Sequence, residues 1–223
     1  MGCLKLIIKL AIVILAIIGF KAIGGWDWCV KNFPKLHFGE KPTQEVLIQK
    51  SRDVADFSKI PDEYEISKSA NVLGYRAVIA NHDASGQKLA VVNENKNLKL
   101  TKEDFKNGQL KKKIDGINKK LEYQYVHIEN FKILKQGTMH AMGQTVPYAL
   151  FEADVTNLPV KKIKGMISVA TDKEGKNKII VSANEGNKYS QIIAQEFFKN
   201  VKLSDITNDK ENKQTKFQKN NKK

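Results

Sequence analysis

Arginine and cysteine are scarce in this sequence, and their scarcity excludes two classes of protein. Only Arg52 and Arg76 are arginines among 38 basic residues, so the net charge of +14 comes mainly from lysine. Recognition of base edges in nucleic acids favours the planar, bidentate guanidinium group, which argues against sequence-specific nucleic-acid binding. Two cysteines are too few for a disulfide framework or a cysteine-rich zinc module.

Sequence signatures of common catalytic sites are also absent. The chain contains no nucleophile elbow (G-x-S-x-G), no H-E-x-x-H zinc motif and no Walker A phosphate loop. Residues 137–143 (GTMHAMG) include two glycines but lack the lysine and the serine or threonine that hold phosphate. This stretch therefore predicts a strand, a turn and a second strand. The sequence favours a binding protein over an enzyme and predicts no catalytic residue, no cofactor and no metal site.

A long apolar run near the N-terminus predicts a membrane anchor. Residues 10–20 (LAIVILAIIGF) are apolar or small, and the wider stretch 4–23 spans about 30 Å as a helix, enough to cross a bilayer. Three aromatic residues lie where an interfacial belt belongs: Phe20, Trp26 and Trp28. We expect residues 1–28 to form an uncleaved, single-pass anchor with the domain outside the cytoplasm. A cleaved secretory signal is the alternative, although no typical cleavage site follows the apolar run.

Half of the net charge lies in the terminal segments. Residues 1–42 carry a net +4 and residues 205–223 a net +3 of the total +14. Further lysines share one face of a predicted helix: Lys111, Lys112, Lys113, Lys119 and Lys120. Each lysine held near an anionic bilayer contributes about 1 kcal/mol to binding. A solvated face is the ordinary role of such lysines, and non-specific binding of anionic lipid headgroups or of nucleic acid is the alternative.

The rest of the chain divides into a linker, one domain and a tail. Residues 29–42 contain two prolines and a glycine and predict a linker, whereas residues 204–223 have little apolar content and predict a disordered basic tail. Within the domain, 43–203, a helical period is expected in three segments. They are 43–57 with Thr43 as its N-cap, the stretch after the capping box formed by Thr101 and Asp104, and 189–203.

The remaining segments of the domain alternate in the manner of strands. A hairpin is expected between 74–81 and 87–92, and further strands over 123–136, 138–145, 148–155, 162–171 and 178–183. Successive strands without helices between them cannot pair mainly in parallel, because parallel pairs need long crossovers. The predicted fold class is therefore α+β: a mostly antiparallel sheet covered by about three helices and preceded by the N-terminal transmembrane helix.

Three stretches of the domain resemble the PsbP-like superfamily. They are the early hairpin 74–92 (GYRAVIANHDASGQKLAVV), the late strand pair 165–185 (GMISVATDKEGKNKIIVSANE) and the C-terminal helix 189–201 (YSQIIAQEFFKNV). The resemblance covers residues 58–203 and implies an α/β/α sandwich around an antiparallel sheet. It also implies a non-catalytic accessory or binding domain, commonly tethered outside the cytoplasm.

Two sets of side chains are candidates for a site in the domain. The first is polar: His127, His140, Glu152 and Asp154. Histidines beside carboxylates would suit acid–base chemistry or a metal ion, which makes an envelope hydrolase the alternative function. The second set is aromatic and would line a ligand groove: Tyr75, Tyr123, Tyr125 and Tyr148. The leading prediction is a single-pass, membrane-anchored binding or accessory domain without catalytic activity.

Overall fold

The computed structural model describes residues 42–72, 75–94, 100–106, 108–113, 127–156 and 161–204. The helices are α3 (Gln44–Ser51), α4 (Lys102–Lys106), α6 (Gln191–Asn200) and the short 3₁₀ helix η1 (Gly186–Lys188). The strands are β1 (Tyr64–Val72), β2 (Tyr75–His82), β3 (Lys88–Asn93), β4 (His127–Ala141), β5 (Gln144–Thr156), β6 (Lys162–Thr171) and β7 (Asn177–Glu185). Residues 109–113 are also helical.

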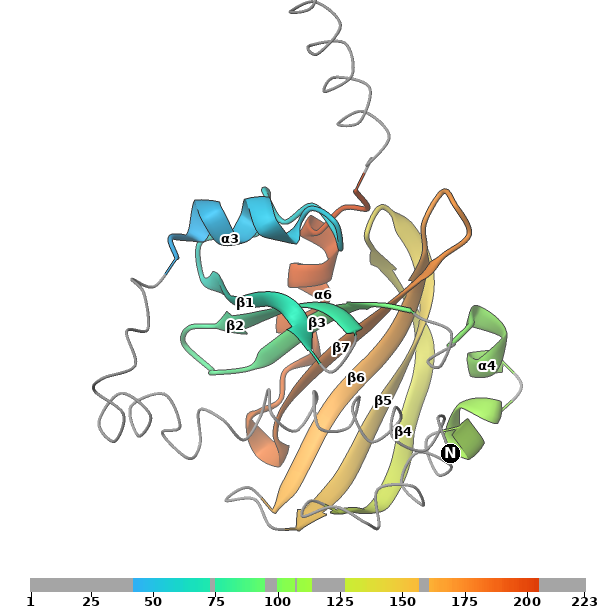
Figure 1. The fold of residues 1–223 in the computed structure, drawn as a ribbon. Helices are drawn as coiled ribbons and strands as arrows, with labels where there is room; N and C mark the ends of the chain where they lie inside the picture. Colours follow the sequence, from blue (N-terminus) through green and yellow to red (C-terminus); the bar gives the residue numbers. More distant parts are fainter. Residues whose placement is uncertain are drawn as a thin grey trace, which may run out of the picture.

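The seven strands form one sheet in the order β1-β2-β3-β7-β6-β5-β4. Every neighbouring pair is antiparallel, and most consecutive strands are joined by short turns. The connection between β3 and β4 is the long one, and β4 lies at the opposite edge of the sheet. The chain then returns through β5 and β6, so that β7 pairs with β3 and joins the first three strands to the last four. In Figure 1 the sheet is strongly twisted: β1 to β3 run across the view, whereas β4 to β6 run down it.

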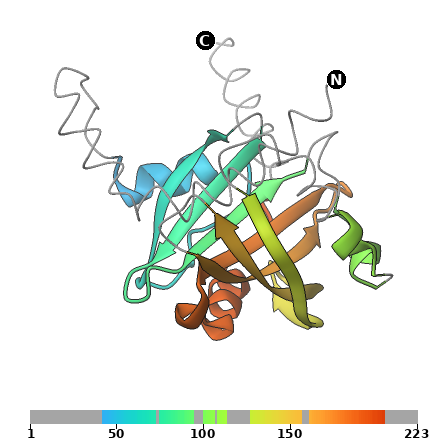
Figure 2. The same ribbon diagram turned by 90° about the horizontal axis from the view of Figure 1, so that it is seen from below.

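Both faces of the sheet are buried. The central strand β7 accordingly has buried residues in successive positions, because its side chains point alternately to the two faces. On one face Val91 and Ile180 pack in a core that includes Phe197 of α6 and Leu47 of α3. On the other face a second core combines Phe151 of β5, Val181 of β7 and Phe105 of α4. Figures 1 and 2 show α4 on the far side of the molecule from α3.

The predicted fold class is wrong in its balance of helix and strand. Strands make up 51% and helices 23% of the described residues, which form a seven-stranded sheet with four short helices. After Thr101 the apolar period predicted a helix reaching Leu121. Residues 109–113 of this stretch are helical, and residues 114–126 lie outside the described part of the chain. α4 is separate from this helix because it ends at Lys106 and Gly108, with φ of +66°, interrupts the helical path. Glycine is favoured in this left-handed conformation just beyond a helix end.

The predicted transmembrane helix was part of the same fold-class prediction, and no described residue supplies one. Among residues 42–204, as far as they are described, no helix is long and apolar enough to cross a bilayer. Residues 1–28, the interfacial Phe20, Trp26 and Trp28, most of the linker 29–42 and nearly all of the tail 204–223 lie outside the described residues.

The predicted helix caps are confirmed, although the helices are shorter than expected. The hydroxyl of Thr43 accepts a hydrogen bond from the Val46 amide at 3.5 Å, and the Thr101 amide donates to Asp104 at 2.8 Å. α3 ends at Ser51 instead of continuing to Phe57, because the following segment turns into the core. In α6, the apolar period of 189–203 includes Ile192, yet this side chain is 75% exposed.

Strand boundaries near residue 137 also differ from the prediction. β4 runs through Gly137 without a break, and Pro147 lies inside β5 instead of between two strands. The turn falls at Met142 and Gly143, both of which have positive φ, at +53° and +76°. Such a two-residue turn matches the twist of the strands that it joins. The glycines of GTMHAMG therefore serve strand packing and a hairpin.

Candidate functional site

The register of β4 and β5 separates the histidine from the carboxylates in the predicted polar set. His140 lies opposite Thr145, whereas Glu152 lies opposite Lys132, seven residues further along β5. At about 3.4 Å per residue this amounts to about 24 Å. His127 pairs with Thr156 at the same end as Asp154, but its side chain is outside the described part of the structure.

Glu152 and Asp154 share one face of β5 and are already paired with cations or donors. Glu152 forms ion pairs with Lys162 at 3.4 Å and Lys164 at 3.6 Å. Asp154 accepts a hydrogen bond from the Asn130 side chain at 2.8 Å. Among the described residues, no group of three or more histidine, cysteine or acidic side chains is arranged to hold a metal ion.

The aromatic set does not form a groove in the described part of the chain. Tyr148 is 5% exposed and packs in the core beneath α6. Tyr123, Tyr125 and the side chain of Tyr75 are outside the described part of the structure. Of the lysine set, Lys111 to Lys113 are exposed, and Lys113 pairs with the buried Asp104 at 2.6 Å, whereas Lys119 and Lys120 are outside the described residues.

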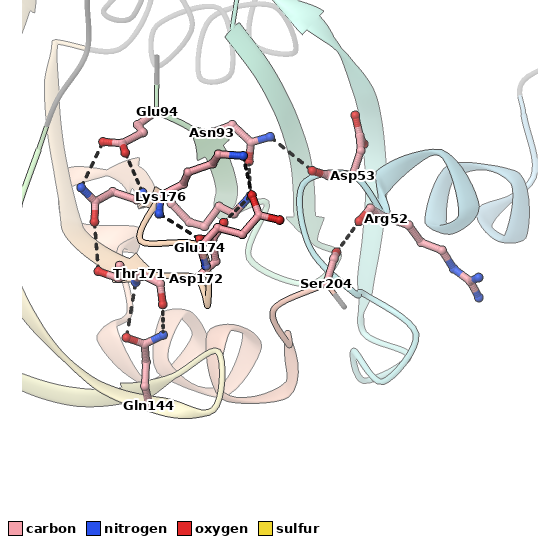
Figure 3. Close-up of polar contacts among 12 residues, drawn as sticks. Arg52, Asp53, Asn93, Glu94, Gln144, Thr171, Asp172, Glu174, Lys176 and Ser204 are labelled. Carbon is pink, nitrogen blue, oxygen red and sulfur yellow. Dashed lines mark hydrogen bonds and ion pairs between the residues drawn. The ribbon is translucent and has the colours of Figure 1, made fainter. Parts of the chain in front are cut away.

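A different group of polar side chains surrounds a hollow of about 200 Å³ at one end of the sheet. We call it the Lys178 hollow. It is lined by Asp53, Asn93, Glu94, Asp172, Lys173, Glu174, Lys176, Asn177, Lys178 and Ser204. These residues come from four places in the sequence: the segment after α3, the end of β3, the β6–β7 hairpin and the segment after α6. In Figure 3, Asp53 and Ser204 lie on one side, and Asp172, Glu174 and Lys176 on the other.

Strand register explains why these residues meet. Asn93 of β3 pairs with Lys178 of β7, which pairs in turn with Ala170 of β6. Because side chains alternate along a strand, Asn93 and Lys178 point to the same face as Val91 and Ile180. That face packs against α3 and α6. Asn93 and Lys178 therefore continue the row of Val91 and Ile180 to the end of the sheet that the helices do not cover. The hollow lies where the apolar layer ends.

Lys178 is an unusual lysine because its side chain is only 8% exposed. Its ammonium group donates a hydrogen bond to Asn93 Oδ1 at 2.8 Å and lies 3.6 Å from a carboxylate oxygen of Asp172. Burial lowers the pKa of Lys178 below its ordinary value, and the neighbouring carboxylates of Asp172 and Asp53 only partly oppose this effect. A perturbed, buried ionisable group beside a hollow is a typical feature of functional sites.

The β6–β7 hairpin holds the Asp172 carboxylate in place. Asp172 Oδ1 accepts hydrogen bonds from the backbone amides of Glu174 at 3.0 Å and Lys176 at 2.9 Å. Gly175, with φ of +78°, permits this tight turn. The other oxygen of Asp172 faces Lys178. The turn therefore fixes one carboxylate at the base of the hollow, with its charge directed at a buried ammonium.

A chain of amide hydrogen bonds supports the same end of the sheet (Figure 3). Glu94 accepts from the backbone amide of Asn177 at 2.9 Å and from its side chain at 3.0 Å. The Thr171 hydroxyl contacts Asn177 Oδ1 at 2.9 Å, and Gln144 donates to the Thr171 carbonyl at 2.8 Å. These contacts join β3, β5, β6 and β7, so the wall of the hollow is held by side chains from four strands.

Two rim groups come from the helix layer. Asp53 forms a two-point ion pair with Arg76, in which the Nη2–Oδ1 contact measures 2.8 Å, and its carboxylate side chain is 52% exposed. The backbone carbonyl of Asp53 accepts from Asn93 at 3.3 Å. Ser204 donates to the carbonyl of Arg52, whose side chain points away from the hollow in Figure 3.

Sequence patterns alone do not identify this site. Lys178 is one of 36 lysines and lies at the start of a predicted strand, where a solvent-facing lysine is ordinary. Its burial depends on pairing β7 with β3, which are 85 residues apart at Lys178 and Asn93. Asp172 and Gly175 are residue types that favour turns, but nothing in them predicts that the hairpin encloses a lysine.

Comparison with known proteins does not assign a ligand to this geometry. No protein-family model and no curated protein matches the sequence. The chemistry available in the hollow is therefore that of its own side chains: a buried ammonium, carboxylates at its base and rim, and amides between them. Such an arrangement can recognise a small polar molecule by charge and hydrogen bonding.

Proposed function

We propose that this chain is a non-catalytic binding domain, held at a membrane by its N-terminal segment, whose ligand occupies the Lys178 hollow. The observation that carries the proposal is the buried Lys178 ammonium, 8% exposed, set at a hollow lined by charged and amide side chains. Burying an ammonium group costs free energy unless its donors are satisfied. Natural proteins retain such unfavourable features mainly at functional sites.

The size of the hollow limits the ligand. Pockets that enclose drug-sized molecules or nucleotide cofactors measure about 300–1,000 Å³. A hollow of about 200 Å³ is smaller and suits a metabolite of a few non-hydrogen atoms. Its side chains are charged or amide-bearing except for Ser204, which favours a water-soluble ligand over a lipid tail.

Membrane attachment is supported by the sequence alone. The apolar stretch 4–23 has the length of a bilayer-spanning helix, and lysines near its ends can place their ammonium groups at the interface. The resemblance to PsbP-like domains also implies a tethered accessory domain. We accordingly propose that the binding domain works close to a membrane surface, outside the cytoplasm.

Thermal unfolding in the presence of pooled small polar metabolites tests the binding proposal. A ligand present at about 100 times its Kd stabilises the folded chain by about 2.7 kcal/mol. We expect at least one pool to raise the Tm of the full chain and of Lys188→Met, whose ammonium is 62% exposed and paired with Glu185. The same pool should leave Lys178→Met unchanged. Equal Tm shifts in all three chains, or none in any pool, would contradict the proposal.

Membrane fractionation tests the anchor separately. We expect the full chain to stay in the membrane pellet after salt and alkaline carbonate washes. Replacing Ile14 and Ile17 with lysine places two charges at the centre of the apolar run, where each costs about 2.5–3.5 kcal/mol, and should release the chain. Release of the unmodified chain by carbonate would overturn the membrane part of the proposal while leaving ligand binding untouched.

A further inference from the structure

We infer that the Lys178 hollow recognises a small zwitterion, a molecule that carries a carboxylate and an ammonium group as an amino acid does. This inference rests on the proposed binding function and names the chemical class of its ligand. It follows from the unused donor on Lys178, from the carboxylates at the rim and from the balance of charge around the hollow.

The carboxylate of the ligand is selected by Lys178. An ammonium group has three N–H donors. Within the described part of the chain, Lys178 makes one hydrogen bond, to Asn93 at 2.8 Å, and its contact with Asp172 at 3.6 Å is longer than a hydrogen bond. At least one donor is therefore left for a ligand. A negatively charged acceptor satisfies it best, because charge-assisted hydrogen bonds are about twice as strong as neutral ones.

The ammonium of the ligand is selected by carboxylates nearer the solvent. Asp53 and Glu174, with side chains 52% and 55% exposed, lie on opposite sides of the hollow in Figure 3. Asp53 is paired with Arg76 and Glu174 with Lys176, and each carboxylate is exposed enough for an oxygen to accept a further hydrogen bond. A carboxylate offers about four lone-pair sites. The hollow therefore holds the Lys178 ammonium beside the Asp172 carboxylate at its base and two further carboxylates at its rim.

The charges around the hollow nearly cancel, which favours a ligand with no net charge. Four carboxylates and three ammonium groups line it, and Arg76 beside Asp53 supplies a fourth cation. An anion alone would bind Lys178 and face the rim carboxylates, whereas a cation alone would face the buried ammonium. A ligand with both groups satisfies both ends. The volume of about 200 Å³ suits a molecule of amino-acid size.

Three matched probes test this inference by calorimetric titration into the full chain. Alanine carries both charges, propionate lacks the ammonium group, and ethylamine lacks the carboxylate, while the carbon skeleton is kept or shortened by one carbon. We expect saturable binding of alanine and at least about tenfold weaker binding of propionate and of ethylamine, since each loses one charge-assisted contact. No binding of alanine, or equal binding of a singly charged probe, would overturn the inference.

Two substitutions locate the binding. Lys178→Met keeps most of the side-chain volume and should weaken alanine binding about tenfold or more, whereas the exposed control Lys188→Met should leave it unchanged. If Lys178→Met fails to fold, Glu174→Gln is the second variant, because that side chain is 55% exposed and its loss cannot disrupt the core. It should weaken binding of alanine but not of propionate. Unchanged alanine binding in the variant that folds would place the ligand elsewhere.

The outcomes separate this inference from the proposed function. If a metabolite pool stabilises the chain through Lys178 but alanine does not bind, the binding domain stands and the zwitterion is wrong. If no pool and none of the three probes binds, both fall.

Discussion

Gln87 and Asp104 are buried polar residues that brace this domain, and each has identifiable partners. Gln87 is fully buried and its side-chain amide donates to Ser182 Oγ at 2.8 Å and to the Ser190 carbonyl at 2.9 Å, while its oxygen accepts from the Ser190 amide at 2.8 Å. Asp104 is held by Lys113 and the Thr101 amide, and these contacts outweigh burial and lower its pKa. Lys178 differs from both because its donors are not all used.

Replacing Gln87 with leucine should destabilise the fold strongly. The change removes the partners of the Ser182 hydroxyl and the Ser190 amide, and leaves the Ser190 carbonyl with only the Ala194 amide at 3.5 Å. Each unsatisfied group costs about 1–3 kcal/mol, so we expect a loss of about 2–4 kcal/mol in the free energy of unfolding. Urea denaturation measures it. The exposed Gln136→Leu control should change stability by about 0.5 kcal/mol or less, and a similar small value for Gln87→Leu would contradict the bracing role.

Lys178 should make the stability of the domain depend on pH in the alkaline range. Its folded pKa is lowered from the ordinary 10.5, mainly by burial, so between the two values the unfolded chain binds more protons than the folded one. Stability then rises with pH across that window. We expect the free energy of unfolding of the native chain, relative to Lys178→Met, to be larger at pH 10 than at pH 8. A difference that stays constant between the two pH values would mean that Lys178 is not perturbed.

At the scale of whole elements, local signals predicted the β2–β3 hairpin and the caps at Thr43 and Thr101, because these depend on neighbouring residues. Elements that depend on long-range packing were predicted less well. β4 continues through Gly137, which was interpreted as a break, because a glycine there accommodates the ring of Tyr148 from β5. Which polar side chains meet likewise depends on long-range pairing. Only the strand register separates His140 from Glu152 and brings Asn93 to Lys178.

Gly165 in β6 should be sensitive to even a methyl group. A Cβ atom there would lie 2.5 Å from the ring of Phe151 and 2.5 Å from the backbone oxygen of Ser182, which cannot move without disturbing β7. We expect Gly165→Ala to lower the free energy of unfolding by about 2 kcal/mol or more, as overpacking does. Gly186→Ala is the control, because its nearest neighbour is the flexible Lys162 at 3.4 Å. Equal midpoints in urea for the two variants would refute this packing argument.

On the scale of the whole molecule, the segments after α3 and after α6 are tied together. The Asp56 amide donates to the Lys202 carbonyl at 2.8 Å, and the Lys202 amide donates back to Asp56 at 3.0 Å. Val201 beside this bridge is fully buried. The bridge closes the helix layer over the sheet and positions Asp53 and Ser204 on the rim of the Lys178 hollow.

Truncation after Val201 should therefore weaken the domain more than truncation after Ser204. The shorter chain loses two backbone hydrogen bonds worth about 0.5–1.5 kcal/mol each, together with the packing of Leu203. We expect it to unfold at a lower urea concentration than the chain ending at Ser204. It should also bind the zwitterion less tightly, because Ser204 is lost from the rim of the hollow. Identical midpoints for the two truncated chains would show that the bridge contributes nothing to stability.

The central claim is that the Lys178 hollow holds the ligand, and an amide chemical-shift map of the full chain titrated with alanine tests it most directly. We predict saturable shifts at Asn93, Lys178 and the Asp172–Lys176 hairpin, together with Asp53 across the hollow. Amides of the η1 turn (Gly186–Lys188), at the other end of β7 from Lys178, should stay unchanged. Shifts that centre on that turn or spread evenly over the sheet, or the absence of any saturable shift, would contradict the account.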